Sequence, residues 1–368
     1  MNPTLTILLV GALVAASCAL LGTFLVLRKM ALLGDAISHA VLPGIALAFL
    51  LTSSRSSLIM LVGAGALGLL TVFLVEVLHR TRRMYEDASI GVVFPALFAL
   101  GVIFISRYAG AVDLDLDCVL YGEIGLSPHD LLYVGGRSLG PRALWVVGGV
   151  LLVDLLLVLG LYKELKIVTF DPALAASLGF SPVLLHYVLM GSVSLTVVGS
   201  FESVGAILVV ALLVVPPATA YLLTHKLWQM LVLAVALGVA AAASGYAVAR
   251  WWDCSIAGAM AMMAGVFFLG ALVFSPRHGL AARALASRRM ATQLSAKLLL
   301  LHLREEGPEA STVDLRGRFA WGASRLQRVL SRLEHDGLVE VGTTGVRLSA
   351  SGRRLLEASG TDALAHRD

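Results

Sequence analysis

The chain has 368 residues, of which 58% are hydrophobic and 14% charged, and its mean hydropathy is +0.88. A soluble domain usually carries about a quarter charged residues. The low charged fraction of this chain therefore excludes an ordinary solvated surface and indicates lipid as the solvent. Residues 1–280 hold 14 Lys/Arg and 14 Asp/Glu, whereas residues 281–368 hold 14 and 10. The net charge of +4 therefore lies in the last quarter, and this break predicts two domains, 1–280 and 281–368.

The first domain contains a series of long apolar runs. A membrane helix needs about 20 mostly apolar residues to cross about 30 Å of hydrocarbon. Runs of this kind lie at 4–27, 31–51, 57–78, 88–106, 142–161, 183–199, 203–223, 227–249 and 254–274. They predict an all-α polytopic membrane protein with about nine transmembrane helices. A count of eight stays open, because the second and sixth runs are short or interrupted by Gly and Pro.

The basic residues between the runs indicate the orientation in the cell inner or plasma membrane. Lys and Arg concentrate in cytoplasmic connections. With a cytoplasmic C-terminal domain, nine spans place the N-terminus outside, and the inside connections then hold eight Lys/Arg against five outside. The outer loop at about 108–141 is acidic, which suits a face that attracts cations.

One polar pair interrupts the second run. Ionisable side chains inside a membrane cost at least about 2.5 kcal/mol each, so they require a reason. Asp35 and His39 are four residues apart and share a helix face, where they offer an oxygen and a nitrogen ligand to Mn, Fe or Zn. A two-fold related partner could supply a matching pair. The alternative is that the two side chains only satisfy each other and hold helices together. Glu202, at the outer end of a helix, is a weaker metal candidate, with a solvated carboxylate as its alternative.

A short amphipathic helix is expected in the inside connection at 169–179. Asp171 is a capping residue, Pro172 suits the first turn, and Gly179 follows the end. Such a helix on the cytoplasmic side suits docking to a soluble partner. Elsewhere, Glu76 and Arg80 are expected to form an ion pair, and Asp154 is expected to bond a neighbouring helix.

These motifs together resemble a known family. The segment 27–44, with the sequence LRKMALLGDAISHAVLPG, closely resembles the signature of the zinc/manganese/iron class of metal ABC transporter permeases. Segments at 86–91, 120–122, 170–172, 204–213 and 216–220 resemble its further motifs. The resemblance covers roughly residues 5–275.

The resemblance implies a lipid-embedded permease that works as a homodimer or heterodimer. It implies two cytoplasmic ABC ATPase subunits docked on the coupling helix, and an extracytoplasmic metal-binding protein that delivers the ion. Asp35 and His39 would line the metal path. The coupling helix would comprise Phe170, Asp171, Pro172, Ala173, Ala175 and Gly179.

No catalytic activity and no permanently bound cofactor are expected of the chain itself. It has no GxxxxGK[ST] phosphate-binding pattern, so ATP hydrolysis is expected in a separate subunit. Mn, Zn or Fe is the expected transported substrate, and the choice among them stays open. A secondary transporter or channel that needs no ATPase is a competing interpretation, against which the coupling-helix motif argues.

The second domain is predicted to be a small α+β winged helix. Helices are expected at 293–304, 313–319 and 323–335, followed by two strands with a wing turn at 342–345. In the first helix, Leu294, Leu298 and Leu301 are expected to face the core. In the third, the inward residues are expected to be Leu326, Val329, Leu330 and Leu333, and the outward residues Arg325, Arg328 and Arg332.

This tail resembles the N-terminal domain of iron-dependent repressor-type regulators, through residues 331–339 and 348–353. In such domains the third helix enters the DNA major groove, and Arg325, Arg328 and Arg332 would contact phosphates. Winged helices also dock proteins, and a role at the ATPase interface is favoured over nucleic acid. The alternative function for the whole chain is a membrane-anchored metal-responsive transcriptional regulator.

Overall fold

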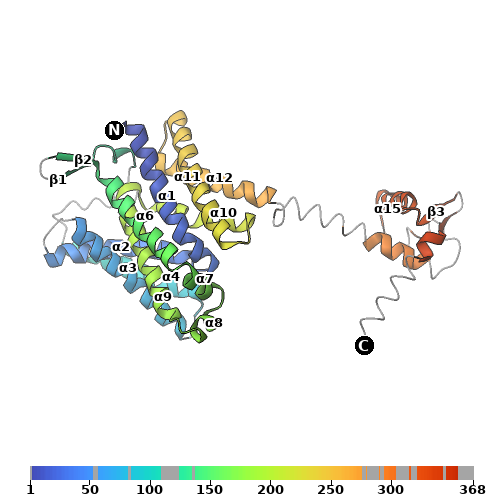
Figure 1. The fold of residues 1–368 in the computed structure, drawn as a ribbon, viewed down its shortest axis with the longest axis horizontal. Coiled ribbons are helices and arrows are strands. Elements are labelled where there is room, and N and C mark those ends of the chain that lie inside the picture. The colour runs from blue at the N-terminus through green and yellow to red at the C-terminus, as the bar shows by residue number, and fades with distance from the viewer. Residues whose placement is uncertain are drawn as a thin grey trace. The chain divides into compact units, whose positions relative to one another are not determined.

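The computed structural model describes residues 2–52, 57–81, 84–108, 124–134, 137–275, 279, 290, 294–303, 315, 321–342 and 345–354. The chain divides into two compact units, Met1–Gly279 and Leu280–Asp368 (Figure 1). Where the structure describes the chain, the first unit consists of helices and one short hairpin, and the second of helices and another hairpin.

Each predicted apolar run forms a helix in the first unit. The helices are α1 (Pro3–Leu27), α2 (Leu32–Thr52), α3 (Ser57–Arg80), α4 (Glu86–Tyr108), α6 (Arg142–Gly160), α9 (Pro182–Val204), α10 (Ala206–Leu223), α11 (Leu227–Trp252) and α12 (Ile256–Phe274). Among the described residues, eight are long and apolar enough to span a membrane, and α2 falls outside that set. The polytopic all-α fold is thus confirmed, while the ninth span stays a prediction.

Helix α1 lies at the centre of one half of this unit, against α6, α9, α10 and α11 (Figure 1). It is apolar on all sides, as expected of a helix surrounded by others, and Val10, Val14 and Phe24 are fully buried. Its approach to α10 depends on Gly22. A Cβ there would lie 1.8 Å from the carbonyl oxygen of Leu213.

A proline explains this close carbonyl. Pro217 lies within α10, four residues after Leu213, and proline has no N–H to donate to that carbonyl and displaces it sterically. The displaced oxygen needs room beside it. Glycine on α1 provides that room because it has no side chain. The proline and the glycine together therefore permit the close contact between the two helices.

Buried polar groups join three of the helices. The Thr196 hydroxyl of α9 donates to Asp154 Oδ2 of α6 at 2.7 Å, and the Ser17 hydroxyl of α1 donates to the same oxygen. Asp154 is fully buried, and an acceptor inside a bundle must find its donors on neighbouring helices. The expected bond between Asp154 and a neighbouring helix is therefore confirmed, with two neighbours rather than one.

Helix α2 packs closely between α3 and α4. A Cβ on Gly44 would lie 2.7 Å from the Cα of Ala64 in α3, and one on Gly101 of α4 would lie 2.8 Å from the Pro43 ring of α2. Small residues permit such close approach of backbones. This packing fixes the helix that carries Asp35 and His39.

Two connections of the first unit have structure of their own. Strands β1 (Leu131–Val134) and β2 (Arg137–Pro141) form an antiparallel hairpin before α6, preceded by the turn η1 (Ile124–Leu126). Between α6 and α9 lie the short helices α7 (Tyr162–Phe170) and α8 (Pro172–Ser177). Most of the acidic residues expected in the outer loop lie outside the described residues.

The second unit has its own apolar core. It contains a helix at Leu294–Leu303, α15 (Ala323–His335), and the antiparallel strands β3 (Val339–Val341) and β4 (Val346–Leu348). As predicted, α15 buries Leu326, Val329, Leu330 and Leu333. The predicted helix at 313–319 lies outside the described residues except for Leu315, which is buried. Assignment of this unit to a winged helix stays a prediction.

The predicted orientation of the first tail helix is wrong. Leu294, Leu298 and Leu301 are exposed, and the buried side is formed by Leu299, Leu300 and Leu303. The helix is apolar on both faces. Periodicity found an apolar face, but it could not tell which of the two the core covers.

Candidate metal site and coupling element

Asp35 and His39 lie one turn apart on α2. The His39 Nε2 atom is 3.6 Å from Asp35 Oδ1, and both side chains are partly exposed. The spacing of four residues places them on one face, as expected. The pair thus presents an imidazole nitrogen and a carboxylate oxygen side by side, a ligand combination suited to Mn, Fe or Zn.

Two aromatic rings of α4 hold the imidazole. The Phe94 ring stacks on His39 with ring centroids 5.3 Å apart, and the Phe98 ring meets it edge-on at 6.1 Å. Aromatic contacts of this geometry restrict the rotation of a ring. Sequence reasoning missed this role for both residues. Their spacing of four on α4 was the available signal, but it could not show that His39 lies opposite.

The pair supplies only part of a metal coordination sphere. Within the described residues, no three His, Cys, Asp or Glu side chains come together in a group that could hold a metal ion. Zn and Mn take four or more ligands. Further ligands would come from outside this set, and Glu202 does not join Asp35 and His39.

Glu202 instead pairs with a cation near the start of α6. Its Oε1 atom lies 3.3 Å from Arg142 Nη2, and more than half of the side chain is exposed. Arg142 Nη1 also lies 4.0 Å from Asp130 Oδ2, and the Arg142 backbone N–H donates to the Asp130 carbonyl oxygen at 2.8 Å. The arginine therefore joins the end of α9 to the residue before β1.

The predicted coupling helix is present as α8, and a second short helix, α7, precedes it. Asp171 separates α7 from α8, and its Oδ1 accepts a hydrogen bond from the Leu174 N–H at 2.9 Å. Pro172 occupies the first turn of α8, and Gly179 has the left-handed φ of +89°, which favours glycine. The capping and ending predictions are confirmed, and so is the short helix between them, whereas α7, which ends at Phe170 before the cap, was not predicted.

The element is anchored on one side and open on the other. Ala175 is fully buried and packs with Val168 and Leu185, while Ala173 is exposed. Phe170, Leu174 and Leu178 are also exposed. An apolar surface around a capped, anchored helix is typical of a protein-docking site.

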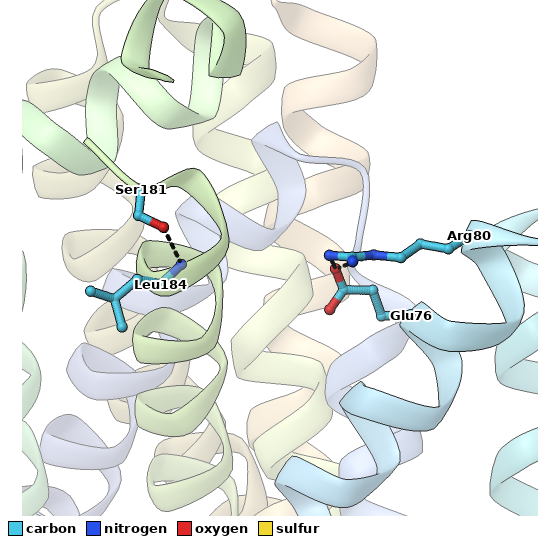
Figure 2. Close-up of polar contacts among 4 residues, drawn as sticks. All are labelled: Glu76, Arg80, Ser181 and Leu184. Atoms are coloured by element: carbon cyan, nitrogen blue, oxygen red, sulfur yellow. Dashed lines mark hydrogen bonds and ion pairs between the residues drawn. The ribbon is translucent and has the colours of Figure 1, made fainter. Parts of the chain in front are cut away.

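One polar contact joins this element to the segment after α1, and two further polar contacts lie on α9 and α3. Figure 2 shows the Ser181 hydroxyl accepting from the Leu184 N–H, which caps α9, and the Glu76–Arg80 pair on α3. The predicted Glu76–Arg80 ion pair is thus confirmed. Arg28, just after α1, donates from Nε to the Thr169 hydroxyl at 3.2 Å. Burial lowers the pKa of Arg28, but a guanidinium keeps its charge in proteins.

The arginines expected to face outward lie on α15. The Arg328 and Arg332 side chains are exposed, and Arg328 Nε donates to the Ser324 carbonyl oxygen at 3.0 Å. The Arg325 side chain lies outside the described residues.

Comparison with known proteins identifies the relatives of the first unit. The chain is 50% identical over 284 residues to the manganese transport system membrane protein MntD of Bacillus subtilis, a match covering 77% of this chain and 96% of that protein. It is 46% identical over 361 residues to the zinc transport system membrane protein TroD of Treponema pallidum, covering 96% and 98%. The second match includes the C-terminal unit.

A solved structure has the same fold. It is PsaBC from Streptococcus pneumoniae in complex with a Fab, with a TM-score of 0.63, 30% identity, and coverage of 76% of this chain and 94% of that one. The family model of the ABC 3 transport family matches residues 2–275, which include all nine long helices. On this match and these identities, the chain belongs to the ABC 3 transport family.

Proposed function

We propose that this chain is the permease subunit of an ATP-driven ABC importer for divalent transition-metal ions. The observation that carries the proposal is the Asp35–His39 pair, an O and N ligand set 3.6 Å apart on a helix within the family-matched region. Relatives named for manganese and zinc transport support it. The ligand types accept Mn, Zn or Fe without choosing among them.

The metal would cross as a transported substrate, held briefly by few ligands. Two protein ligands per chain bind weakly enough for release, which transport requires. A second permease subunit, identical or a sister chain, would supply a matching pair across the interface. Glu202 is the weaker candidate, because its carboxylate is already paired with Arg142.

Phe94 and Phe98 would fix the imidazole of His39 for this purpose. A ring held between aromatic faces keeps its nitrogens in a defined direction, which lowers the entropy lost when an ion binds. Their part in the proposal is to position the ligand rather than to bind the ion.

Energy would enter through separate cytoplasmic ATPase subunits. The α7–α8 element supports this because its exposed apolar residues Phe170, Leu174 and Leu178 surround the buried anchor Ala175. Force applied at α8 would reach α1 through the hydrogen bond between Arg28 and Thr169. An extracytoplasmic protein would deliver the ion to the opposite face, with the N-terminus outside and the C-terminal unit in the cytoplasm.

Uptake in proteoliposomes tests the proposal. The vesicles would contain this chain, its ATPase and its binding protein, and radiolabelled Mn, Zn and Fe would be compared for wild type, Asp35→Ala and His39→Ala. Thr71→Val is the matched control, since the Thr71 hydroxyl bonds the Leu67 carbonyl oxygen of its own helix. We expect wild type to take up at least one of the three metals. Both ligand variants should assemble but lose this uptake, and the control should retain it.

Two outcomes would contradict this proposal in different ways. Normal uptake by Asp35→Ala and His39→Ala would remove those residues from the metal path and leave the importer intact. No uptake by wild type with its ATPase would favour a channel or a sensor instead.

The C-terminal unit supports a second candidate, a membrane-anchored transcriptional regulator. The observation in its favour is the exposed Arg328 and Arg332 on α15, followed by the β3–β4 hairpin. A regulatory or assembly role at the ATPase interface is favoured, because α15 also carries the exposed acid Glu334. Salt-dependent retention of specific DNA by the full chain, lost in Arg328→Ala/Arg332→Ala, would support the regulator.

A further inference from the structure

One face of the first helix in the C-terminal unit is apolar and uncovered. Met290, Leu294, Leu298 and Leu301 are 62%, 57%, 50% and 40% exposed. Positions 294, 298 and 301 follow one another at helical spacing and share a face, and Met290 precedes the described start of this helix. The core of the unit already buries the other face, through Leu299, Leu300 and Leu303, so the stripe lies outside that core.

The sequence from the end of α12 through the stripe carries only positive charge, and acidic residues follow it at Glu305, Glu306 and Glu309. Residues 276–304 contain no Asp or Glu, and their Lys and Arg residues are Arg277, Arg283, Arg288, Arg289, Lys297 and Arg304. Lys297 is exposed on the Leu294–Leu303 helix, on the same side as the stripe. Basic residues beside a membrane helix attract anionic headgroups, by about 1 kcal/mol for each Lys or Arg near the surface.

The chain also tethers the stripe to the membrane-inserted unit. Helix α12 ends at Phe274, and Met290 follows 16 residues later in the sequence. Even a fully extended segment of that length reaches at most about 58 Å. Met290 is therefore tethered within about 58 Å of the point where α12 ends.

We propose that Met290, Leu294, Leu298 and Leu301 form a docking surface for the anionic lipid bilayer into which the same chain is inserted. An interfacial helix places its apolar side chains at the boundary of headgroups and acyl chains, with basic residues among the phosphates. The stripe supplies the apolar side chains and Lys297 the adjacent cation. This inference needs only membrane insertion and is independent of the metal path.

Charge argues against a second copy of the chain as the occupant. Two copies of residues 276–304 would bring together six basic residues each, and the acids that follow, Glu305, Glu306 and Glu309, lie beyond the last position of the stripe. Like charges in contact are unfavourable. An anionic lipid surface meets the same six residues with opposite charge.

Nitroxide accessibility in proteoliposomes tests the proposal on the full chain. A spin label at Leu301→Cys, with Cys118 and Cys254 replaced by Ser, would be exposed to oxygen, which partitions into lipid, and to a water-soluble nickel chelate. Gln327→Cys on the exposed side of α15 is the matched aqueous control. The vesicles would contain phosphatidylcholine with or without phosphatidylglycerol.

We expect the oxygen-to-nickel accessibility ratio at 301 to exceed that at 327 several-fold, and to fall when phosphatidylglycerol is omitted or salt is raised. Adding Leu294→Ser and Leu298→Ser should return the ratio to the control value, and these exposed positions leave the core intact. High nickel accessibility at 301 in anionic vesicles would overturn the proposal. Low accessibility to both reagents would also overturn it, because a protein partner would then cover the stripe.

Discussion

Substitution of Gly22 by alanine tests the packing of α1 against α10. An added Cβ would lie 1.8 Å from the Leu213 carbonyl oxygen and 2.8 Å from the carbonyl carbon. An ordinary contact between carbon and a carbonyl oxygen is about 3.3 Å or longer. The two helices would therefore have to separate by about 1.5 Å, since the clash is with backbone and no side chain can rotate away.

The expected loss of stability follows from two opposing terms. Overpacking of a core costs about 1–3 kcal/mol, and a backbone clash belongs at the upper end. Alanine gains up to about 1 kcal/mol over glycine in a helix interior. The net loss is about 2 kcal/mol, or a change of up to about 30-fold in the ratio of folded to unfolded protein.

Reversible unfolding by sodium dodecyl sulfate in mixed micelles measures this change, with the five tryptophans as the fluorescent reporter. The matched control is Gly148→Ala on α6, where a Cβ would meet nothing within 4 Å. It should unfold like wild type or at slightly higher detergent. If Gly22→Ala were as stable as Gly148→Ala, the close packing of α1 on the Leu213 carbonyl would be refuted.

Three further predictions use other contacts. Asp154→Ala leaves the Ser17 and Thr196 hydroxyls without their acceptor, and two interhelical bonds at about 0.6–1.7 kcal/mol each predict a loss of about 1–3 kcal/mol in the same assay. Asp154→Asn, which keeps an acceptor oxygen, should have a stability between those of wild type and Asp154→Ala. Leu174→Ser should reduce co-purification of the ATPase, whereas Ser177→Ala on the same helix should not; equal recovery would remove α8 from that interface. Glu202→Gln should cost less than about 1 kcal/mol, since its ion pair is exposed, and should leave metal uptake unchanged. Loss of uptake would instead place Glu202 on the metal path.

The sequence by itself determined the features that arise within one turn or one run of residues. Apolar runs predict the long helices because hydrocarbon requires length and leaves few other ways to satisfy a backbone. The Asp171 cap, the Gly179 ending and the shared face of Asp35 and His39 are equally local. Each depends on backbone geometry over three to eight consecutive residues, so it can be predicted from the local sequence.

Contacts between distant segments could not be obtained in this way. Asp154 finds its donors 137 residues before and 42 residues after it in the chain. His39 meets Phe94 and Phe98 on another helix. Periodicity assigns a face to each helix but does not pair the faces, so no local rule connects these residues.

The tail helix shows the limit most clearly. Leu294, Leu298 and Leu301 have the spacing of a core-facing stripe, yet Leu299, Leu300 and Leu303 fill the core. A helix with two apolar faces can bury either of them in the core, and the local pattern gives no reason to prefer one face. Tertiary packing decides between them, because only the face whose side chains fit the surrounding helices and strands is buried, and the other is left for a solvent or a surface.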